Sequence, residues 1–541
     1  MLPSMKRRKL KAEQQLPVMK QSHRKRAKKK IKKIQQKKKT EVEAIEEEQN
    51  EDETQQRRSN RTRKEPDRLT YARTADTRGF FAGDPETYQY QDAISSTDAD
   101  NWIEAMNQEI DALHTNNTWT LTTLPPGRST IKSRWTFKLK LKGDGSVDRH
   151  KARLVAKGFT QRAGIDYHET YSPVVKHDSL RAVLSIIAAE DLEIAQMDIT
   201  TAFLHGDLTE EIYLQQPEGL IVAGKEHEVY RLHKSLYGLK QAPGTWNQKF
   251  NNFLVKFGLV ASQSDPCVYY QRNGNDVIMV AIWVDNGLLA SNKETLLSEI
   301  VMYMKEHFDI KTGPADFFIG LLIKRDRQNR CLHVSQPSYT KRMLSKFNIL
   351  DCNPKSTPAD SNAHLTAEIS PSDTHNRELP PYREAVGSLM YCMLATRPVI
   401  SFAVGRVAQF NNNPGKAHWE AVKRIMSYLK ETADFGIRFV GGTNDGTLRA
   451  FSDADYAGDV DTRRSTTGYI LLLNNGPIGW TSRRQQCTTL STTEAEYVAA
   501  CEATKEIVWM RNLLNHIGLP QANNSTQAQQ LYFVTTRAPS V

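Results

Sequence analysis

Two carboxylates in this sequence stand where they could hold divalent metal ions. Asp285 is the single acid of the run AIWVDNGLLASN, and Asp198 ends the strand-like run LEIAQMDI. A carboxylate in apolar surroundings is costly unless it is paired or holds a cation. Two carboxylates carried on neighbouring strands could converge on divalent metal. The alternative is that the two aspartates only cap backbone groups, one at a turn and one at a strand end.

The element that must position Asp285 is a β-hairpin. The residues before it, VIMVAIWV (277–284), are of strand-forming types, and Asn286-Gly287 is a dipeptide typical of tight hairpin turns. The pattern therefore predicts that Asp285 lies at a hairpin tip.

A second predicted hairpin is basic. Residues 135–159, WTFKLKLKGDGSVDRHKARLVAKGF, alternate apolar and basic residues about a Gly-Asp-Gly turn, which predicts a ribbon with one cationic face. Lys and Arg side chains suit phosphate groups. The candidates for phosphate contacts are Lys138, Lys140, Lys151 and Arg153. The alternative is an ordinary solvated ribbon face.

Two helices are predicted beside these hairpins. Residues 102–113 have apolar side chains at helical spacing, with Asp98 or Asp100 available as the N-cap. A second helix begins near Trp246 and is stopped by Gly258.

The charge of the chain is unevenly distributed. The net charge is +11, but residues 1–40 hold 17 Lys or Arg and one acid, so the remainder is slightly acidic. This basic arm cannot bury enough apolar surface to fold alone, which predicts disorder. It is either a nuclear-import signal or nucleic-acid arm, or a solvated tail.

The composition excludes several classes of protein. Six widely spaced cysteines show no zinc or redox pattern, which is typical of a reduced intracellular protein. There is no apolar run long enough to span a bilayer and no signal-peptide core, so membrane insertion and secretion are not expected.

Several ordered stretches resemble the reverse transcriptase of copia-type retrotransposon polyproteins. They run from about Trp102 to Glu506 and include WIEAMNQEIDAL, RHKARLVAKGFTQRAGIDYHETYSPVVK, QMDITTAFLHGDLTEEIYLQQPEG and LHKSLYGLKQAPGTW. The resemblance implies an RNA-directed DNA polymerase that acts on an RNA template, a DNA primer and dNTPs with two Mg²⁺ or Mn²⁺ ions. It implies an α+β fold of the right-hand type, with fingers, palm and thumb, followed by an incomplete ribonuclease H-like α/β unit.

The resemblance also assigns roles to residues. The metal ligands would be Asp198, the carbonyl of Ile199, Asp285 and Asn286, with Asp198 and Asp285 catalytic. The nucleotide would contact Lys151, Arg153, Phe203, whose ring would floor the sugar pocket, and Gln241. The template and primer would contact Lys138, Lys140 and Trp283.

One position departs from the family. Copia-type polymerases read Tyr-Val-Asp-Asp where this chain reads Trp283-Val284-Asp285-Asn286. Asparagine keeps a carbonyl oxygen but removes a negative charge beside the cations, so metal occupancy should fall. The alternative function is therefore a catalytically degenerate nucleic-acid-binding protein of the same fold. A third hypothesis is a nuclear nucleic-acid-binding protein that works through the basic arm.

The C-terminal stretch resembles the ribonuclease H of the same elements. Asp453 and Glu494 match its first two acids, although Glu494 could instead close a helix capping box. No acid follows Glu506, so the third and fourth acids are missing and we expect no ribonuclease H activity. We also expect the apolar helix face of Ile507, Leu513 and Leu514 to be left exposed.

The resemblance gives a domain order and a cellular setting. The expected order is a basic disordered arm (1–40), a charged linker like that after integrase (41–95), fingers and palm (96–345), thumb and connection (346–446), a truncated ribonuclease H-like unit (447–517) and a tail (518–541). The chain would be the C-terminal portion of a Pol polyprotein. It would act in nucleus and cytoplasm, inside a virus-like particle, and associate with itself or with other Pol products.

Overall fold

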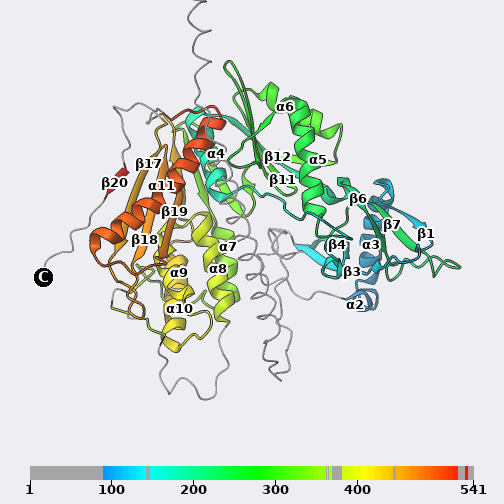
Figure 1. The fold of residues 1–541 in the computed structure, drawn as a ribbon, viewed down its shortest axis with the longest axis horizontal. Helices are drawn as coiled ribbons and strands as arrows, with labels where there is room; N and C mark the ends of the chain where they lie inside the picture. Colours follow the sequence, from blue (N-terminus) through cyan, green and yellow to red (C-terminus); the bar gives the residue numbers. More distant parts are fainter. Residues whose placement is uncertain are drawn as a thin grey trace, which may run out of the picture. The chain divides into compact units, whose positions relative to one another are not determined.

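The computed structural model describes residues 89–141, 147–360, 362–363, 365–367, 381–442, 446–521 and 531–533 (Figure 1). The predicted basic arm and all but the end of the predicted linker lie outside these residues. Within them, no helix combines the length and the apolar character that crossing a membrane requires. The predicted α+β class is confirmed, because helices pack against several mainly antiparallel sheets.

The first part of the described chain is built on the basic ribbon and a small sheet. The ribbon pairs β3 (Ser133–Leu141) with β4 (Val147–Ala156), and the sheet has the order β1-β7-β6-β2. Its strands are β1 (Trp119–Thr122), β2 (Thr130–Ile131), β6 (Asp207–Leu214) and β7 (Val229–Lys234). The helices are α2 (Tyr90–Ile94), inside the predicted linker, and α3 (Ala99–Thr115), which confirms the predicted opening helix.

The apolar face of the ribbon explains why α3 packs there. Trp102 of α3 is almost fully buried, and its ring meets that of Phe137 edge to face at 5.3 Å. Because side chains alternate across a strand, burying Phe137 and Leu154 leaves the basic residues on the opposite face.

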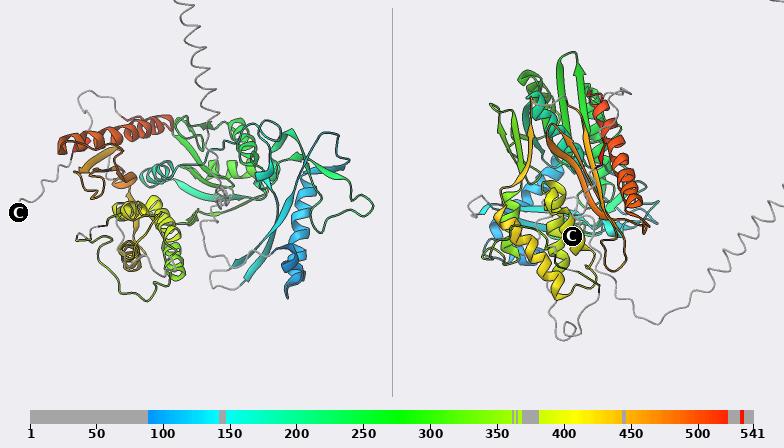
Figure 2. Two further views of the ribbon diagram at one scale, coloured as in Figure 1. Left: turned by 60° about the horizontal axis from the view of Figure 1, so that its bottom comes forward. Right: turned by 90° about the vertical axis from the view of Figure 1, so that its left-hand side faces the viewer.

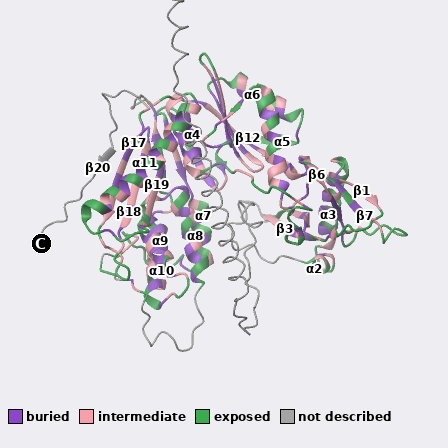
Figure 3. Ribbon diagram, in the orientation of Figure 1, coloured by how far each residue is buried: buried purple, intermediate pink, exposed green. Residues whose placement is uncertain are grey.

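The second part is a six-stranded sheet of order β12-β5-β11-β10-β9-β8. Its strands are β5 (Glu193–Ile199), β8 (Val260–Ala261), β9 (Val268–Asn273), β10 (Asp276–Trp283), β11 (Asn286–Ser291) and β12 (Ile310–Pro314). Its helices are α4 (His177–Glu190), α5 (Ala242–Phe257) and α6 (Glu294–Lys305). The predicted stop of α5 is confirmed, since its C-cap is Gly258 with φ +107°. Buried residues follow the central strands (Figure 3).

The third part is a four-stranded sheet of order β13-β14-β15-β16 with a helical group beside it. The strands are β13 (Phe317–Phe318), β14 (Leu321–Asp326), β15 (Cys331–Ser335) and β16 (Gly436–Val440). The helices are α7 (Pro337–Lys346), α8 (Tyr382–Ala395), α9 (Ser401–Ala408) and α10 (Lys416–Glu431). β15 and β16 are neighbours in the sheet although the helices lie between them in sequence.

The last part is a sheet of order β19-β18-β17-β20 with one long helix along it (Figure 2). The strands are β17 (Arg449–Asp455), β18 (Thr466–Leu473), β19 (Gly476–Arg484) and β20 (Leu531–Phe533), and the helix is α11 (Thr492–His516).

The expected exposure of the α11 apolar face is wrong. Leu513 and Leu514 are fully buried and Ile507 is nearly so, in one core cluster with α4 and the six-stranded sheet. The helix packs on β17 and β18, and its apolar face joins residues of α4 and β9 in that cluster. The indole of Trp509 also donates to the carbonyl of Ser264 at 3.0 Å. Nearby, Nε of Arg272 donates to the carbonyl of Ile517 at 2.9 Å.

Candidate active site

Asp285 lies at the tip of the hairpin formed by β10 and β11. Trp283 pairs with Asn286, so the two turn residues are Val284 and Asp285. The predicted position of Asp285 is thus observed, but the predicted Asn286-Gly287 turn is wrong, since both residues belong to β11.

Two contacts with residues distant in sequence surround this turn. A Cβ on Gly287 would overlap the side chain of Met197, its partner on β5, so glycine here leaves room for that side chain. Val284 adopts φ +58°, a left-handed conformation that is strained for a β-branched residue. The indole of Trp246 donates to the Val284 carbonyl at 2.7 Å and holds the turn in place.

The sheet brings Asp198 beside this tip. Asp198 on β5 pairs directly with Asn286 on β11, and the N–H of Ile199 donates to the carbonyl of Asp285 at 2.8 Å. Side chains directly opposite each other in an antiparallel pair have Cβ atoms about 5 Å apart. The backbone positions that carry the two carboxylates singled out in the sequence therefore lie side by side at one end of one sheet.

The side chain of Asn286 is hydrogen-bonded to that of Asp285. Its side-chain Nδ2 donates to Oδ1 of Asp285 at 2.7 Å. The amide donor thus occupies a carboxylate oxygen that could otherwise face a cation.

The donor set suits a hard divalent cation, which prefers oxygen ligands. It consists of the carboxylates of Asp198 and Asp285 and the amide oxygen of Asn286. Among the residues that the structure describes, no cluster of three or more Asp, Glu, His or Cys could hold a metal ion. The third place at this site is held by an uncharged amide.

Lys311 is a residue of this site that the sequence did not reveal. It lies on β12, directly opposite Asp198 on the side away from Asn286, and is exposed. A lysine in a short exposed strand carries no motif of its own. Only the pairing of β12 with β5 shows that it flanks the carboxylates.

The predicted cationic face of the β3–β4 ribbon is confirmed. Lys138 pairs with Lys151, Lys140 with Arg149, and Thr136 with Arg153, so these side chains share one face of the ribbon. Arg149 therefore adds a cation to the four residues predicted for this face.

Arg153 and Phe203 are connected through Tyr237. The guanidinium of Arg153 lies 4.5 Å from the Tyr237 ring centroid, and that ring meets Phe203 edge to face at 5.1 Å. The stack joins two residues predicted to contact a nucleotide. Tyr237 itself was missed, although it stands inside the LYGLKQAPGTW stretch.

Gln241 is placed differently from its predicted role. It is 3% exposed, its Nε2 donates to the carbonyl of Asp166 at 2.9 Å, and its Oε1 accepts from Gln161 at 3.0 Å. Both ends of the amide are bonded within the protein. In this structure Gln241 therefore braces the loop before α5 instead of facing an open site.

Trp283 is half-buried against α4. Its ring centroid lies 5.5 Å from that of His177. Burial of the imidazole, with a contribution from Arg181, lowers the pKa of His177 to about 4, so this ring is neutral near pH 7. Trp283 thus joins the hairpin tip to the protein core.

In the C-terminal unit the acid beside Asp453 is Glu496, not Glu494. Oε2 of Glu494 accepts from the N–H of Leu490 at 2.6 Å, while its own N–H donates to Oγ of Ser491, so it closes the helix start. Burial and then the charge of Asp453 raise the pKa of the Glu496 carboxyl. The two glutamates are two positions apart on a helix and so point to different sides.

Known proteins are similar to this chain over most of its length. Residues 116–361 match the family model described as reverse transcriptase (RNA-dependent DNA polymerase). The retrovirus-related Pol polyprotein from transposon TNT 1-94 of Nicotiana tabacum is 44% identical over 470 residues, which cover 86% of this chain and 35% of that polyprotein. The Pol polyprotein from transposon RE2 of Arabidopsis thaliana is 40% identical over 429 residues, covering 79% and 29%.

A shorter relative matches along its whole length. The transposon Ty5-1 protein YCL074W of Saccharomyces cerevisiae is 30% identical over 313 residues, which cover 58% of this chain and 100% of that protein. The chain therefore spans about a third of the two plant polyproteins and all of the yeast protein.

Proposed function

This chain belongs to the reverse transcriptase family of copia-type retrotransposon Pol polyproteins, and we propose that it is an RNA-directed DNA polymerase. The observation that carries the proposal is the pairing of Asp198 with Asn286 beside the Asp285 turn. The substrates would be an RNA template, a DNA primer and dNTPs.

The side chains around the tip suit nucleotidyl transfer. Asp198 and Asp285 would hold two Mg²⁺ or Mn²⁺ ions, with the amide oxygen of Asn286 and the carbonyl of Ile199 as further ligands. When bound, such ions would activate the primer 3′-hydroxyl and neutralise charge on the leaving pyrophosphate.

The ribbon would supply the remaining charge. Lys151 and Arg153 would contact the triphosphate, and Lys138, Lys140 and Trp283 would contact template and primer. Phe203, held by Tyr237, would form the apolar floor under the sugar, where a 2′-hydroxyl would collide with the ring.

Primer extension on an RNA template tests the proposal. The wild-type chain should extend the primer with Mg²⁺ or Mn²⁺, and Asp198→Asn should lower the rate by about two to three orders of magnitude. Asp276→Asn, at the other end of the same hairpin, is the matched control and should leave the rate unchanged. The absence of extension by the wild type, or an equal rate in Asp198→Asn, would contradict the proposal.

A second candidate is a degenerate nucleic-acid-binding protein of the same fold. The observation in its favour is the Asn286 amide bonded to the Asp285 carboxylate. Binding of a primer–template without extension under either metal would support this candidate.

Two further expectations stay predictions. We propose that the chain does not cleave RNA in an RNA/DNA hybrid, which is measured beside Asp453→Asn. Cleavage that this change abolishes would contradict it.

We also propose that residues 1–40 direct the chain to the nucleus, and a fluorescent fusion that stays cytoplasmic would contradict that.

A further inference from the structure

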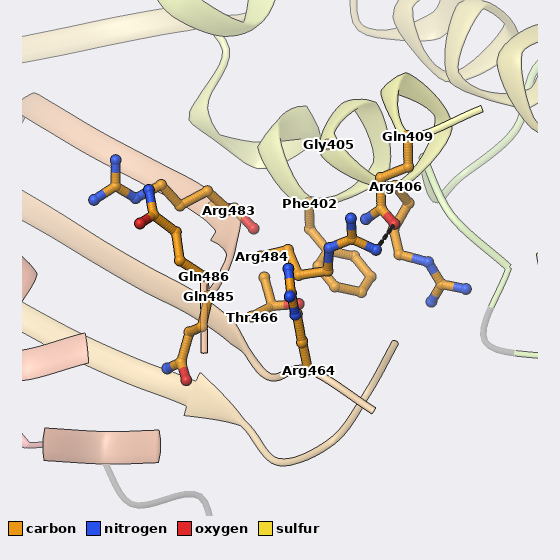
Figure 4. A pocket seen from close by; sticks show the side chains of 11 residues that line it. Phe402, Gly405, Arg406, Gln409, Arg464, Thr466, Arg483, Arg484, Gln485 and Gln486 are labelled. Atoms are coloured by element: carbon orange, nitrogen blue, oxygen red, sulfur yellow. Dashed lines mark hydrogen bonds between the residues drawn. The ribbon is translucent and has the colours of Figure 1, made fainter. Parts of the chain in front are cut away.

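A strongly cationic cavity lies between α9 and the β18–β19 strands (Figure 4). Its volume is about 310 Å³. The lining residues are Phe402, Gly405, Arg406, Gln409, Arg464, Thr466, Ser482, Arg483, Arg484, Gln485 and Gln486.

Two of the four arginines already have carboxylate partners. Arg484 donates through Nη1 to Asp459 at 2.6 Å and to Gln409 at 3.1 Å, and Arg483 pairs with Glu502. These bonds fix the positions of two guanidinium groups on β19.

The other two arginines lack such partners. Arg406 of α9 packs on Phe402, and its charge acts on the Asp455 carboxyl from beyond ion-pair distance. Arg464 precedes β18, and neither arginine forms an ion pair or a side-chain hydrogen bond among the residues described. Both are half-buried. A cavity that holds two such cations has a positive potential that an anion would relieve.

A second cavity, of about 280 Å³, adjoins the first. Phe402 and Ser482 line both, and the second also contains Asp453. Three of its buried oxygens have no hydrogen-bond partner among the described residues: Oγ of Ser401, Oγ of Ser452 and Oδ1 of Asp453. The surface thus runs from the arginines to a second cavity whose walls contain buried polar groups.

We propose that the arginine cavity binds a backbone phosphate of a nucleic-acid strand and holds that strand across Phe402 toward Asp453. Guanidinium groups bind phosphate through paired N–H donors, and Phe402, which is 41% exposed, offers a ring to a sugar or base.

A strand fits better than a free phosphate compound. The cavity continues into a second one with polar groups of its own, which a chain of nucleotides would fill. The inference rests on one part of the proposed function, namely that the protein binds nucleic acid.

The salt dependence of binding tests the site without any catalysis. Fluorescence anisotropy with an RNA/DNA hybrid, without dNTPs, gives the affinity of the full chain at several salt concentrations. Arg406→Gln and Arg464→Gln should each reduce the slope of log affinity against log salt by about 0.7 to 0.9, as expected for one lost phosphate contact. Arg449→Gln removes the same charge from β17 outside the cavity and should leave the slope unchanged.

Two further measurements make each outcome decisive. The thermal midpoint of each variant shows that it is folded, and an unchanged slope in a folded variant overturns the inference. Binding of inorganic triphosphate that the variants lose, with the hybrid slope unchanged, would also overturn it and assign the cavity to a free polyanion. Primer extension by the wild type is measured separately. If the wild type does not extend a primer but the variants reduce the salt slope, only the proposed function is refuted.

Discussion

Asn286 determines how the two carboxylates behave without metal. Its amide donates to Asp285 and it stands directly opposite Asp198, so it provides a polar partner where the family has a third negative charge. We therefore expect this amide to stabilise the metal-free site and to weaken its binding of cations.

We expect Asn286→Asp to raise the primer-extension rate by about two to three orders of magnitude, because it restores a preorganised charge beside the metal ligands. The same change should lower the unfolding temperature without divalent metal, since three carboxylates then crowd one end of the sheet. Added Mg²⁺ should restore that temperature. Asn275→Asp, in the exposed turn before β10, adds the same charge far from the site and should show neither effect. An unchanged extension rate in Asn286→Asp would refute this role.

His177 predicts a pH dependence of stability. Its pKa is lowered to about 4 in the folded protein against an ordinary value of 6.5. Between these values the unfolded chain binds a proton that the folded chain does not, so stability falls as pH drops from about 6.5 toward 4. The contribution is about 1 to 3 kcal/mol.

Urea unfolding at pH 7 and pH 4.5 measures this term. His177→Gln should be less sensitive to pH than the wild type. His114→Gln, at the exposed end of α3, is the control and should behave as the wild type does. Equal pH sensitivity in His177→Gln and the wild type would contradict the assignment.

The sequence predicted which strands come together at the candidate site better than it predicted the local settings of their residues. Asp198 and Asp285 could be paired because each ends an apolar strand. The turn was misplaced because the Asn-Gly signal is local, whereas the contacts of Gly287 with Met197 and of Val284 with Trp246 are not. The resemblance points to Glu494, whereas only the packing of α11 beside β17 reveals that Glu496 is the acid near Asp453.

At the scale of elements, α4 connects three parts of the described structure. Arg181 on this helix is 3% exposed and donates to the carbonyls of Ile478, Leu394 and Ala395 at 2.6 to 3.1 Å, with Asp178 as its ion-pair partner. Its guanidinium also covers the Trp480 ring at 3.9 Å. Burial lowers the pKa of Arg181 to about 10, so it keeps its charge at neutral pH.

Replacing Arg181 should therefore be costly. Arg181→Met leaves several buried carbonyls without their donor, and we expect a loss of about 3 to 5 kcal/mol in the free energy of unfolding. Arg134→Met on the exposed side of β3 is the matched control, with an expected change within about 0.5 kcal/mol. Chemical denaturation followed by tryptophan fluorescence measures both. If Arg181→Met lowers the free energy of unfolding by less than about 1 kcal/mol, the contacts of Arg181 do not hold these parts together.

The basic ribbon shows what an element's own pattern can predict. Alternation alone gives its cationic face, since Phe137 and Leu154 must be buried on the other side. The register adds what the pattern omits, namely the pairing of Arg149 with Lys140.

At the scale of the whole described molecule, one core cluster includes residues of α4, the six-stranded sheet and α11. The sequence could not predict this packing, because the apolar face of α11 carries no information about which surface covers it. The helix that carries the expected exposed face instead packs on β17 and β18, and its C-terminal part also contacts the segment around β8 and β9.

Leu514→Ala should therefore destabilise more than the C-terminal unit. Truncating this fully buried side chain should cost about 2 to 5 kcal/mol, and hydrogen exchange of β9 should accelerate along with that of α11. Val508→Ala, 54% exposed on the same helix, should change neither. Faster exchange confined to α11 would show that the two parts unfold independently.

Strand β16 forms the edge of the four-stranded sheet, beside β15. β15 and β16 are paired along their length, so everything between Ser335 and Gly436 leaves one strand and returns to its neighbour. If a peptide bond in this excursion were broken, the two halves of the chain would still be held together by the backbone hydrogen bonds between β15 and β16. Related elements could lengthen or shorten this excursion outside α8 and α9, which contact Arg181 and β19, while the strands that carry Asp198 and Asp285 keep their register.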